Sequence, residues 1–278
     1  MLSTPKSDCS SDDFNDVAAI VTAMTDAEQP FVSDTLKSVL SDPGIAQVIL
    51  CIAEKNVWID AVIGNFVTDP RLEIVRLPLK PLGAIRNKAL TYVKEAWVAY
   101  CDGDDVWSKG KTKIQRTCAS VTGCDFVGAD HYLTNQEGKI RAFAPAHYLP
   151  MPSSWMVRTE VMKLHPFTEE PFSLRQEESG EWWIRTSGIV KKVRCPKMLL
   201  RYRIRFNSLS ANTSSMQRKA KIIALAKIPV LGAIIFCATG CMWLFSRRQE
   251  YIWQPDWGPE TDPNNCDEKV QSEQIQVS

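Results

Sequence analysis

The chain has 278 residues, with 33 Lys and Arg against 32 Asp and Glu, so its formal net charge is +1 at pH 7. This balance gives no indication of a nucleic-acid partner. The length fits one catalytic domain with an appendage. The nine cysteines are odd in number and scattered, and residues 1–13 are polar without an apolar signal core. These features indicate a reducing compartment and a disordered lead-in over 1–13.

Short apolar runs alternate with segments of helical spacing in the first part of the chain. The runs predict buried strands over 17–23, 48–53, 72–77 and 98–101, and the spacing predicts helices over 31–40 and 83–90. Strands that alternate with helices in this way favour an α/β fold with a mostly parallel sheet that is flanked by helices.

The most informative motif is the acidic run that ends the fourth apolar stretch. Asp102, Gly103, Asp104 and Asp105 follow the expected strand directly, and open α/β sheets bind ligands at the carboxyl ends of their strands. Clustered carboxylates repel one another, and a hard cation such as Mg²⁺ or Mn²⁺ removes that cost while taking further ligands from substrate phosphates. The motif therefore predicts a metal-bridged diphosphate site. A solvated Asp-Gly turn is the alternative.

These stretches, in this order, resemble the family 2 glycosyltransferases, which are inverting enzymes of the GT-A fold. The resemblance spans roughly 16 to 210 and implies a GT-A domain over 14–212. It is carried by segments 35–40, 69–75 with 84–90, 100–107 with 113–115, and 153–158 with 177–185, which lead into 200–203 and 207–210.

The resemblance assigns roles to the acidic motif. Asp104 would be the ligand of Mn²⁺ or Mg²⁺ that reaches the diphosphate of a nucleotide-sugar donor, with a UDP-sugar favoured. Asp102 would sit near the ribose or among the metal's waters, with Gly103 between the two acids. Asp105 would be structural. Arg86 could add a cation near the nucleotide, and a surface arginine is the open alternative.

Inverting transfer needs a carboxylate that takes the proton of the acceptor hydroxyl. The family places this base in a Glu-Asp pair at the start of a helix with Trp and Arg. Here Ser179 occupies the Asp position, and serine is no base at neutral pH. We expect Glu178 to be the base, followed by Glu177 and then Glu181. Ordinary helix capping is the alternative for each glutamate.

The nucleotide pocket implied by the resemblance departs from the family pattern. Thr22 ends the first expected strand, and Glu54 is the acid that follows the second. Some members carry a metal-binding histidine where this chain has Arg205. Arginine does not ligate metals, but Arg205 and Arg203 are candidates for pairing with phosphate.

The acceptor is expected to be a carbohydrate, lipid-linked or protein-linked hydroxyl. Trp155, Trp182 and Trp183 are candidates for the acceptor side, because aromatic rings stack on apolar sugar faces. Burial in the core is the alternative for at least one of them.

Residues 228–246 contain no charged side chain, and about 17–25 residues suffice to span a bilayer core. We expect 213–248 to form a basic-flanked membrane helix, with a single pass favoured and an in-plane or buried helix left open, followed by an acidic polar tail over 249–278. The excess of basic charge before it places the catalytic domain on the cytoplasmic side; the flanking residues are Arg218, Lys219, Lys221 and Lys227 before it and Arg247 and Arg248 after it.

The sequence therefore predicts a membrane-associated inverting glycosyltransferase, with two other classes open. A catalytically degenerate GT-A membrane scaffold would explain Ser179. A sugar nucleotidyltransferase should carry a Gly-rich, basic loop after the first strand, and residues 22–30 contain neither glycine nor a basic residue.

Overall fold

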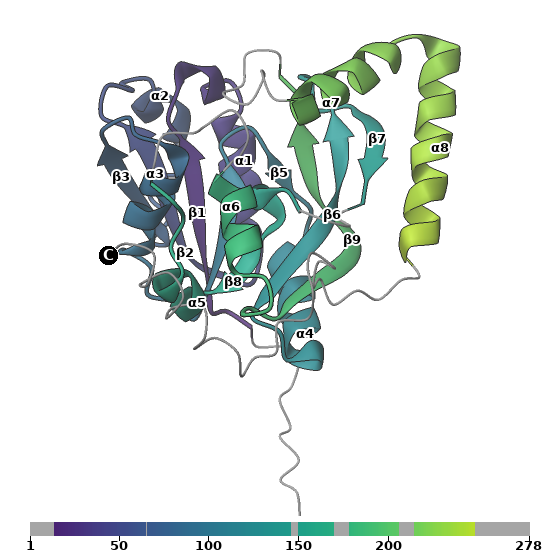
Figure 1. Cartoon of the computed structure of the whole chain (residues 1–278). Helices are drawn as coiled ribbons and strands as arrows, with labels where there is room; N and C mark the ends of the chain where they lie inside the picture. The colour runs from purple at the N-terminus through teal and green to yellow at the C-terminus, as the bar shows by residue number, and fades with distance from the viewer. Residues whose placement is uncertain (1–13, 65, 146–149, 170–177, 206–213, 248–278) are drawn as a thin grey trace, which may run out of the picture.

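The computed structural model describes residues 14–64, 66–145, 150–169, 178–205 and 214–247. They form one sheet with helices on both faces (Figure 1). The strands are β1 (Val17–Ala23), β2 (Ile45–Ala53), β3 (Leu72–Leu77), β4 (Trp97–Asp102), β5 (Val106–Trp107), β6 (Phe126–Thr134), β7 (Ile140–Ala144), β8 (Met156–Arg158) and β9 (Lys192–Arg203). The helices are η1 (Asp26–Glu28), α1 (Val32–Leu40), α2 (Ile59–Ile63), α3 (Leu82–Leu90), α4 (Lys111–Thr122), η2 (Pro152–Ser154), α5 (Thr159–Leu164), α6 (Glu178–Arg185), α7 (Ser214–Leu225) and α8 (Pro229–Arg247).

The first half of the sheet is parallel, in the order β3-β2-β1-β4. The carboxyl ends of these strands therefore meet at one edge, which is where α/β sheets bind ligands. The predicted alternation of strands and helices is confirmed. The second strand begins earlier than expected, at Ile45, and the fourth extends to Asp102.

Successive side chains of a strand point to opposite faces, and in β1, β2 and β4 the side chains on both faces are buried. In β1, Val17, Ala19 and Val21 belong to one apolar cluster, which Leu36 of α1 joins. Ile20 belongs to the cluster on the other face, together with residues of α3 and α6. Two packed faces of this kind explain why these strands are continuous apolar runs.

The second half of the sheet carries the chain back to the acidic motif. Strand β8 is antiparallel to both β4 and β6, while β6 and β9 form a long parallel pair. The end of β9 then lies antiparallel to β5, with Val106 opposite Arg201. Because β5 follows the motif directly, this pairing brings Arg203 and Arg205 to the acids.

Helix α8 is the helix in the described part of the chain that is long and apolar enough to cross a membrane. It lies beside β7 at the outer edge of the sheet, and α7 connects it to the rest of the fold (Figure 1). The backbone N–H of Phe143 in β7 donates to Thr239 Oγ1 of α8 at 3.2 Å. Much of the helix surface remains exposed, so it is no buried core helix.

Candidate functional site

The acidic motif lies at the carboxyl edge of the sheet, as the sequence predicts. Asp102 is the last residue of β4 and pairs in register with Thr22 of β1. The Thr22 hydroxyl donates to Asp102 Oδ1 at 3.1 Å, and the Asp102 N–H donates to Ser153 Oγ at 3.0 Å. The Asp102 carboxylate is therefore fixed in direction but remains partly exposed.

Gly103 is needed for packing at the turn after β4. Its N–H donates to the Thr22 carbonyl at 2.8 Å. A Cβ at this position would lie 2.9 Å from that oxygen and from the Ala23 side chain. Since such contacts are too short for any larger residue, the glycine lets the motif close against the end of β1.

A buried arginine joins the acidic motif to a distant glutamate. Arg86 of α3 donates through Nη2 to Asp102 Oδ1 and through Nη1 to Glu178 Oε1, both at 2.7 Å. Its guanidinium also lies over the rings of Tyr100 and Phe167. Burial alone lowers the pKa of Arg86, but Asp102 and Glu178 more than offset this, and its pKa lies above the ordinary value. The alternative of a surface arginine is thereby excluded.

Asp104 is paired with a second buried cation. Arg205 donates through Nε to Asp104 Oδ2 at 2.5 Å, through Nη1 to the Ala27 carbonyl at 2.8 Å, and through Nη2 to Glu28 Oε1 at 3.3 Å. Burial and the neighbouring charge of Asp102 raise the pKa of Asp104 to about 6, although Arg205 opposes the shift. Arg205 thus occupies one oxygen of the acid to which the resemblance assigns the metal.

Asp105 and Arg203 hold the backbone of the acidic motif against the end of β9. The Asp105 side chain is fully buried, and its Oδ1 accepts the N–H of Arg203 at 3.0 Å. Arg203 Nε donates to the Asp104 carbonyl at 2.8 Å, and its guanidinium lies over Phe31. Burial raises the pKa of Asp105 well above its ordinary value. These contacts agree with a structural Asp105, and they direct Arg203 to backbone oxygens.

Asp102 and Asp104 fit a divalent cation through their chemistry. Both present carboxylate oxygens, which Mg²⁺ and Mn²⁺ prefer. Within the described residues, no group of three or more His, Cys, Asp or Glu forms a ready-made metal cage. A cation here would take its remaining ligands from water or from the phosphates of a bound ligand, as Mg²⁺ commonly does.

The other predicted site residues have different outcomes. Glu54 is exposed just after β2, and its N–H donates to the Leu77 carbonyl. Glu181 forms an i,i+4 ion pair with Arg185 on the surface of α6 at 2.6 Å. Glu177 lies outside the described residues. Of the two described glutamates, Glu178 is the one that Arg86 connects to the motif.

The three tryptophans expected on the acceptor side lie in the core instead. Trp155 and Trp182 have no exposed surface, and Trp183 is buried as well. They surround Phe126 at ring-centroid distances between 5.0 and 5.8 Å. Their indoles therefore present no face to a sugar, and the prediction that they contact the acceptor is corrected. The physical reason is that these large apolar rings stabilise the fold more when they pack together in the core than when they stay exposed to water.

Sequence reasoning missed three polar residues at this edge. Glu28 accepts from Arg205 and also from the N–H and hydroxyl of Thr25, at 2.7 and 2.6 Å. Ser153 orients Asp102. Asn56 is buried with Nδ2 donating to the Ala23 carbonyl, while its Oδ1 has no hydrogen-bond partner among the described residues. Of these three residues, only Glu28 has a recognisable sequence pattern, the Thr25-x-x-Glu28 spacing of a capping box.

No protein-family model and no curated protein matches the chain. Solved structures do match. Residues 1–349 of TarS from S. aureus, in complex with UDP-GlcNAc, align with 75% of this chain at 15% identity and a TM-score of 0.58. The mannosyltransferase PcManGT from Pyrobaculum calidifontis, in complex with GDP-Man and Mn²⁺, aligns with 72% of it at 12% identity and a TM-score of 0.57.

This chain covers 65% of the TarS fragment and 60% of the mannosyltransferase. At such low identities the likeness establishes the fold alone. The chain has the GT-A-type fold of these two structures, with its acidic motif at the carboxyl edge of the sheet, as the sequence predicts.

Proposed function

We propose that the chain is an inverting glycosyltransferase that moves a sugar from a nucleotide-diphosphate sugar, with a UDP-sugar favoured, to an acceptor hydroxyl. The observation that carries the proposal is the bridge through Arg86. It joins Glu178, from a helix late in the fold, to Asp102 at the end of β4. A candidate base thereby lies beside a candidate donor site, as such a reaction requires.

Donor binding would fall to the edge formed by β1 and β4. Asp104, with Asp102 beside it, would hold Mn²⁺ or Mg²⁺, which would neutralise charge on the diphosphate leaving group. Thr22 and Asp102 would contact the nucleoside side, since they lie in register near the carboxyl ends of neighbouring strands. The contacts of Arg203 and Arg205 suggest that these two cations position the acids rather than reach phosphate.

Glu178 would take the proton of the acceptor hydroxyl. Arg86 engages Oε1 of this carboxylate, so proton transfer would use Oε2. Because the guanidinium is buried and also bonded to Asp102, it fixes the direction of the Glu178 side chain. A base oriented in this way contributes typically 10²- to 10⁴-fold to a rate.

Membrane association is part of the proposal. The α8 helix is apolar and largely exposed, so a bilayer is its natural surroundings. We place the catalytic domain on the cytoplasmic side, where nucleotide sugars are made. A carbohydrate or lipid-linked acceptor would meet the site near this surface.

A second candidate is a scaffold with the same fold and no transferase activity. The ion pair between Arg205 and Asp104 favours it, because it engages the acid expected to bind metal. Ser179, in place of the family's aspartate, is buried and favours it as well. Metal-dependent nucleotide binding separates the two candidates.

The test is a thermal-shift series on the full chain with UDP, GDP, TDP and CMP, each with and without Mn²⁺. A ligand at a hundred times its Kd adds about 2.7 kcal/mol of stability, which corresponds to roughly 5–10 °C in a domain of this size. We expect one diphosphate to stabilise the chain only when metal is present.

Asp104→Asn should remove that metal-dependent shift. Asp60→Asn is the matched control, because Asp60 is exposed and paired with Arg76 far along the chain from the motif. Stabilisation by no nucleotide would overturn the transferase and leave the scaffold. Sugar transfer by the stabilised pair, measured as release of the nucleoside diphosphate in the presence of acceptor, completes the test.

A further inference from the structure

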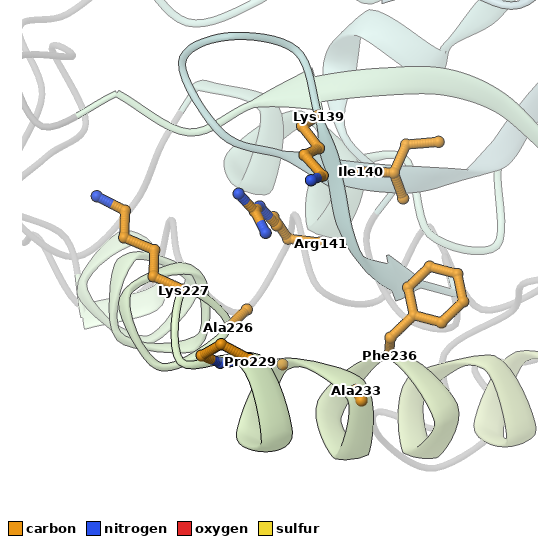
Figure 2. Close-up of a pocket in the computed structure, with 9 residues that line it drawn as sticks. Lys139, Ile140, Arg141, Ala226, Lys227, Pro229, Ala233 and Phe236 are labelled. Atoms are coloured by element: carbon orange, nitrogen blue, oxygen red, sulfur yellow. The ribbon is translucent and has the colours of Figure 1, made fainter.

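A cavity of about 460 Å³ lies away from the acidic motif, between β7 and the corner where α7 passes into α8 (Figure 2). None of the residues that line it belongs to the site described above. Its lining is formed by Lys139, Ile140, Arg141, Ala226, Lys227, Pro229, Gly232, Ala233 and Phe236.

One side of the cavity is cationic. Lys139, Arg141 and Lys227 line it, and none of its lining residues in the described part of the chain is acidic. In Figure 2 the guanidinium of Arg141 lies between the two lysine side chains. Arg141 Nε is buried and has no hydrogen-bond partner among the described residues. A buried donor without a partner is costly, and an anion that enters the cavity would satisfy it.

The other side of the cavity is apolar. Ile140, Ala233 and Phe236 lie there, and Figure 2 places Phe236 at the far end from the ammonium of Lys227. A cavity with cations at one end and apolar groups at the other fits an anionic amphiphile rather than a free anion.

Gly232 makes the corner possible. Its N–H donates to the Ile228 carbonyl at 2.7 Å, and a Cβ at this position would lie 2.4 Å from the Ala226 carbonyl oxygen. Only glycine permits this approach of α8 to the end of α7. The close corner sets Lys227 at the same cavity as Arg141, so the cationic side is built from two separate parts of the chain.

Helix α8 also has an exposed apolar face, which begins at Val230 and Ile234, the sequence neighbours of the lining residues Pro229 and Ala233. Val230 is 74% exposed and Phe245 is 77% exposed, and Ile234 and Met242 are exposed between them. The opposite side of the helix is bonded to the sheet. Trp243 Nε1 donates to Asp130 Oδ2 at 3.1 Å, and this is a polar contact that an ordinary bilayer anchor would not need.

The docked position of α8 favours an in-plane arrangement over a span. Arg194 pairs with Asp130 at 2.6 Å in the core and also donates to the Ser246 carbonyl at 3.0 Å. If α8 crossed a bilayer in this position, the edge strand β7 and this ion pair would lie at the depth of the hydrocarbon. Sheet edges and polar backbone do not occur there, whereas a helix that lies in the interface buries one face only.

We infer that the cavity binds the phosphate of an anionic membrane phospholipid, and that its acyl chains continue along the exposed face of α8 in the plane of the membrane. The inference rests on the membrane association proposed above and names the lipid class and the site. The charge fits the occupant, because basic pockets beside membrane-embedded apolar surface are typical binding sites for lipid headgroups.

The first experiment is co-sedimentation of the full chain with vesicles of phosphatidylcholine alone and with phosphatidylglycerol added. We expect binding to the anionic vesicles and much weaker binding to the neutral ones. A single cation at the membrane surface raises the partition coefficient onto anionic vesicles roughly fivefold. Arg141→Gln should lower this coefficient by a larger factor. Lys80→Gln is the matched control, because Lys80 is exposed and does not line the cavity.

A second pair of variants keeps every charge. Ala233→Trp fills the apolar side of the cavity and should reduce the preference for anionic vesicles. Ala238→Trp, on the same helix but not lining the cavity, should keep that preference. Equal losses in Arg141→Gln and Lys80→Gln, or equal behaviour of the two tryptophan variants, would overturn the cavity as the lipid site.

A thermal-shift arm identifies the source of the phosphate. Dihexanoyl phosphatidylglycerol should stabilise the chain more than inorganic phosphate at the same concentration; equal stabilisation would overturn a lipid occupant. Equal binding to neutral and anionic vesicles would overturn the proposal that the cavity binds an anionic lipid, while membrane association would stand. Binding to neither, or a stable dimer in which α8 is protected, would overturn both. Nucleotide binding is measured separately, so these failures are distinct from failure of the transferase.

Discussion

Arg86 Nη1 lies 2.7 Å from Glu178 Oε1, although 92 residues separate the two in the chain. The same guanidinium bonds Asp102, so a single buried cation sets the spacing between the acidic motif and the first turn of α6. Two carboxylates that would otherwise repel each other are held together by one planar cation that donates one bond to each.

Glu178→Gln should lower kcat for sugar transfer by about 10²- to 10⁴-fold, because the amide accepts a hydrogen bond but takes no proton. Nucleotide binding in the thermal-shift assay should stay near wild type, since Gln still bonds Arg86. Glu181→Gln is the matched control on the same helix, because Glu181 pairs with Arg185 on the surface. A Glu178→Gln enzyme with wild-type kcat would show that another group is the base.

Arg86→Lys tests the bridge itself. A lysine keeps the charge, but its single nitrogen cannot occupy both positions from which the two guanidinium nitrogens of Arg86 bond Asp102 and Glu178. We expect the loss to appear mainly in kcat, on the order of 10- to 100-fold, because a displaced base misaligns the reacting atoms. Arg76→Lys, in an exposed pair with Asp60, should change neither kcat nor KM. A loss confined to KM would assign Arg86 to donor binding instead.

Much of the parallel half of the fold could be predicted from sequence. Strands β1 and β3 have the expected bounds. The continuous apolar run of β1 is what burial on both faces demands. The strand end bearing Asp102 was visible for the same reason. The abrupt change from an apolar run to carboxylates indicates the carboxyl edge of a sheet, even when the neighbouring strands are not known.

The rest of the site depends on long-range pairing that local pattern does not encode. Arg205 reaches Asp104 because β9 pairs with β5. The hydrophobic periodicity of the sequence does not predict the register of this pairing. Glu28 is an ordinary capping residue in sequence and becomes a site residue only when Arg205 arrives. The prediction that the three tryptophans contact the acceptor was wrong for a related reason, since the local sequence around a Trp is equally compatible with a buried core and with a sugar-binding surface.

Asp130→Asn should destabilise the chain strongly. It leaves Arg194 buried without its charged partner and weakens the bond from Trp243 that docks α8. Losing one partner of a buried ion pair costs roughly 3–5 kcal/mol, which is on the order of 10 °C in Tm. The measurement is thermal unfolding, with limited proteolysis of α8 as a second readout.

The matched control for Asp130→Asn is Asp125→Asn. Asp125 pairs with Arg158 at 3.1 Å, but both side chains are more than a third exposed. Exposed pairs contribute roughly 0–1 kcal/mol, so this variant should melt close to the wild type. Equal melting temperatures for the two variants would show that α8 docking does not depend on the Asp130 charge.

Lys192 should make stability depend on pH. Its ammonium is buried, donates to the Trp183 carbonyl at 2.7 Å and lies 4.4 Å from the centre of the Trp183 ring. Burial lowers its pKa from 10.5 to about 7. Between these values the unfolded chain holds a proton that the folded chain has released, so the free energy of unfolding rises with pH across this window.

Lys192→Met removes the titrating group while keeping an unbranched side chain of similar length. Relative to this variant, the free energy of unfolding of the wild type should rise by roughly 1–2 kcal/mol between about pH 7 and pH 9. The rise is limited because the unfolded and folded chains differ by at most one bound proton over these two pH units. The measurement is urea unfolding at each pH. Lys191→Met, at the exposed neighbouring position, should follow the wild-type curve. If the wild-type and Lys192→Met curves run parallel across this range, Lys192 keeps its proton in the folded chain.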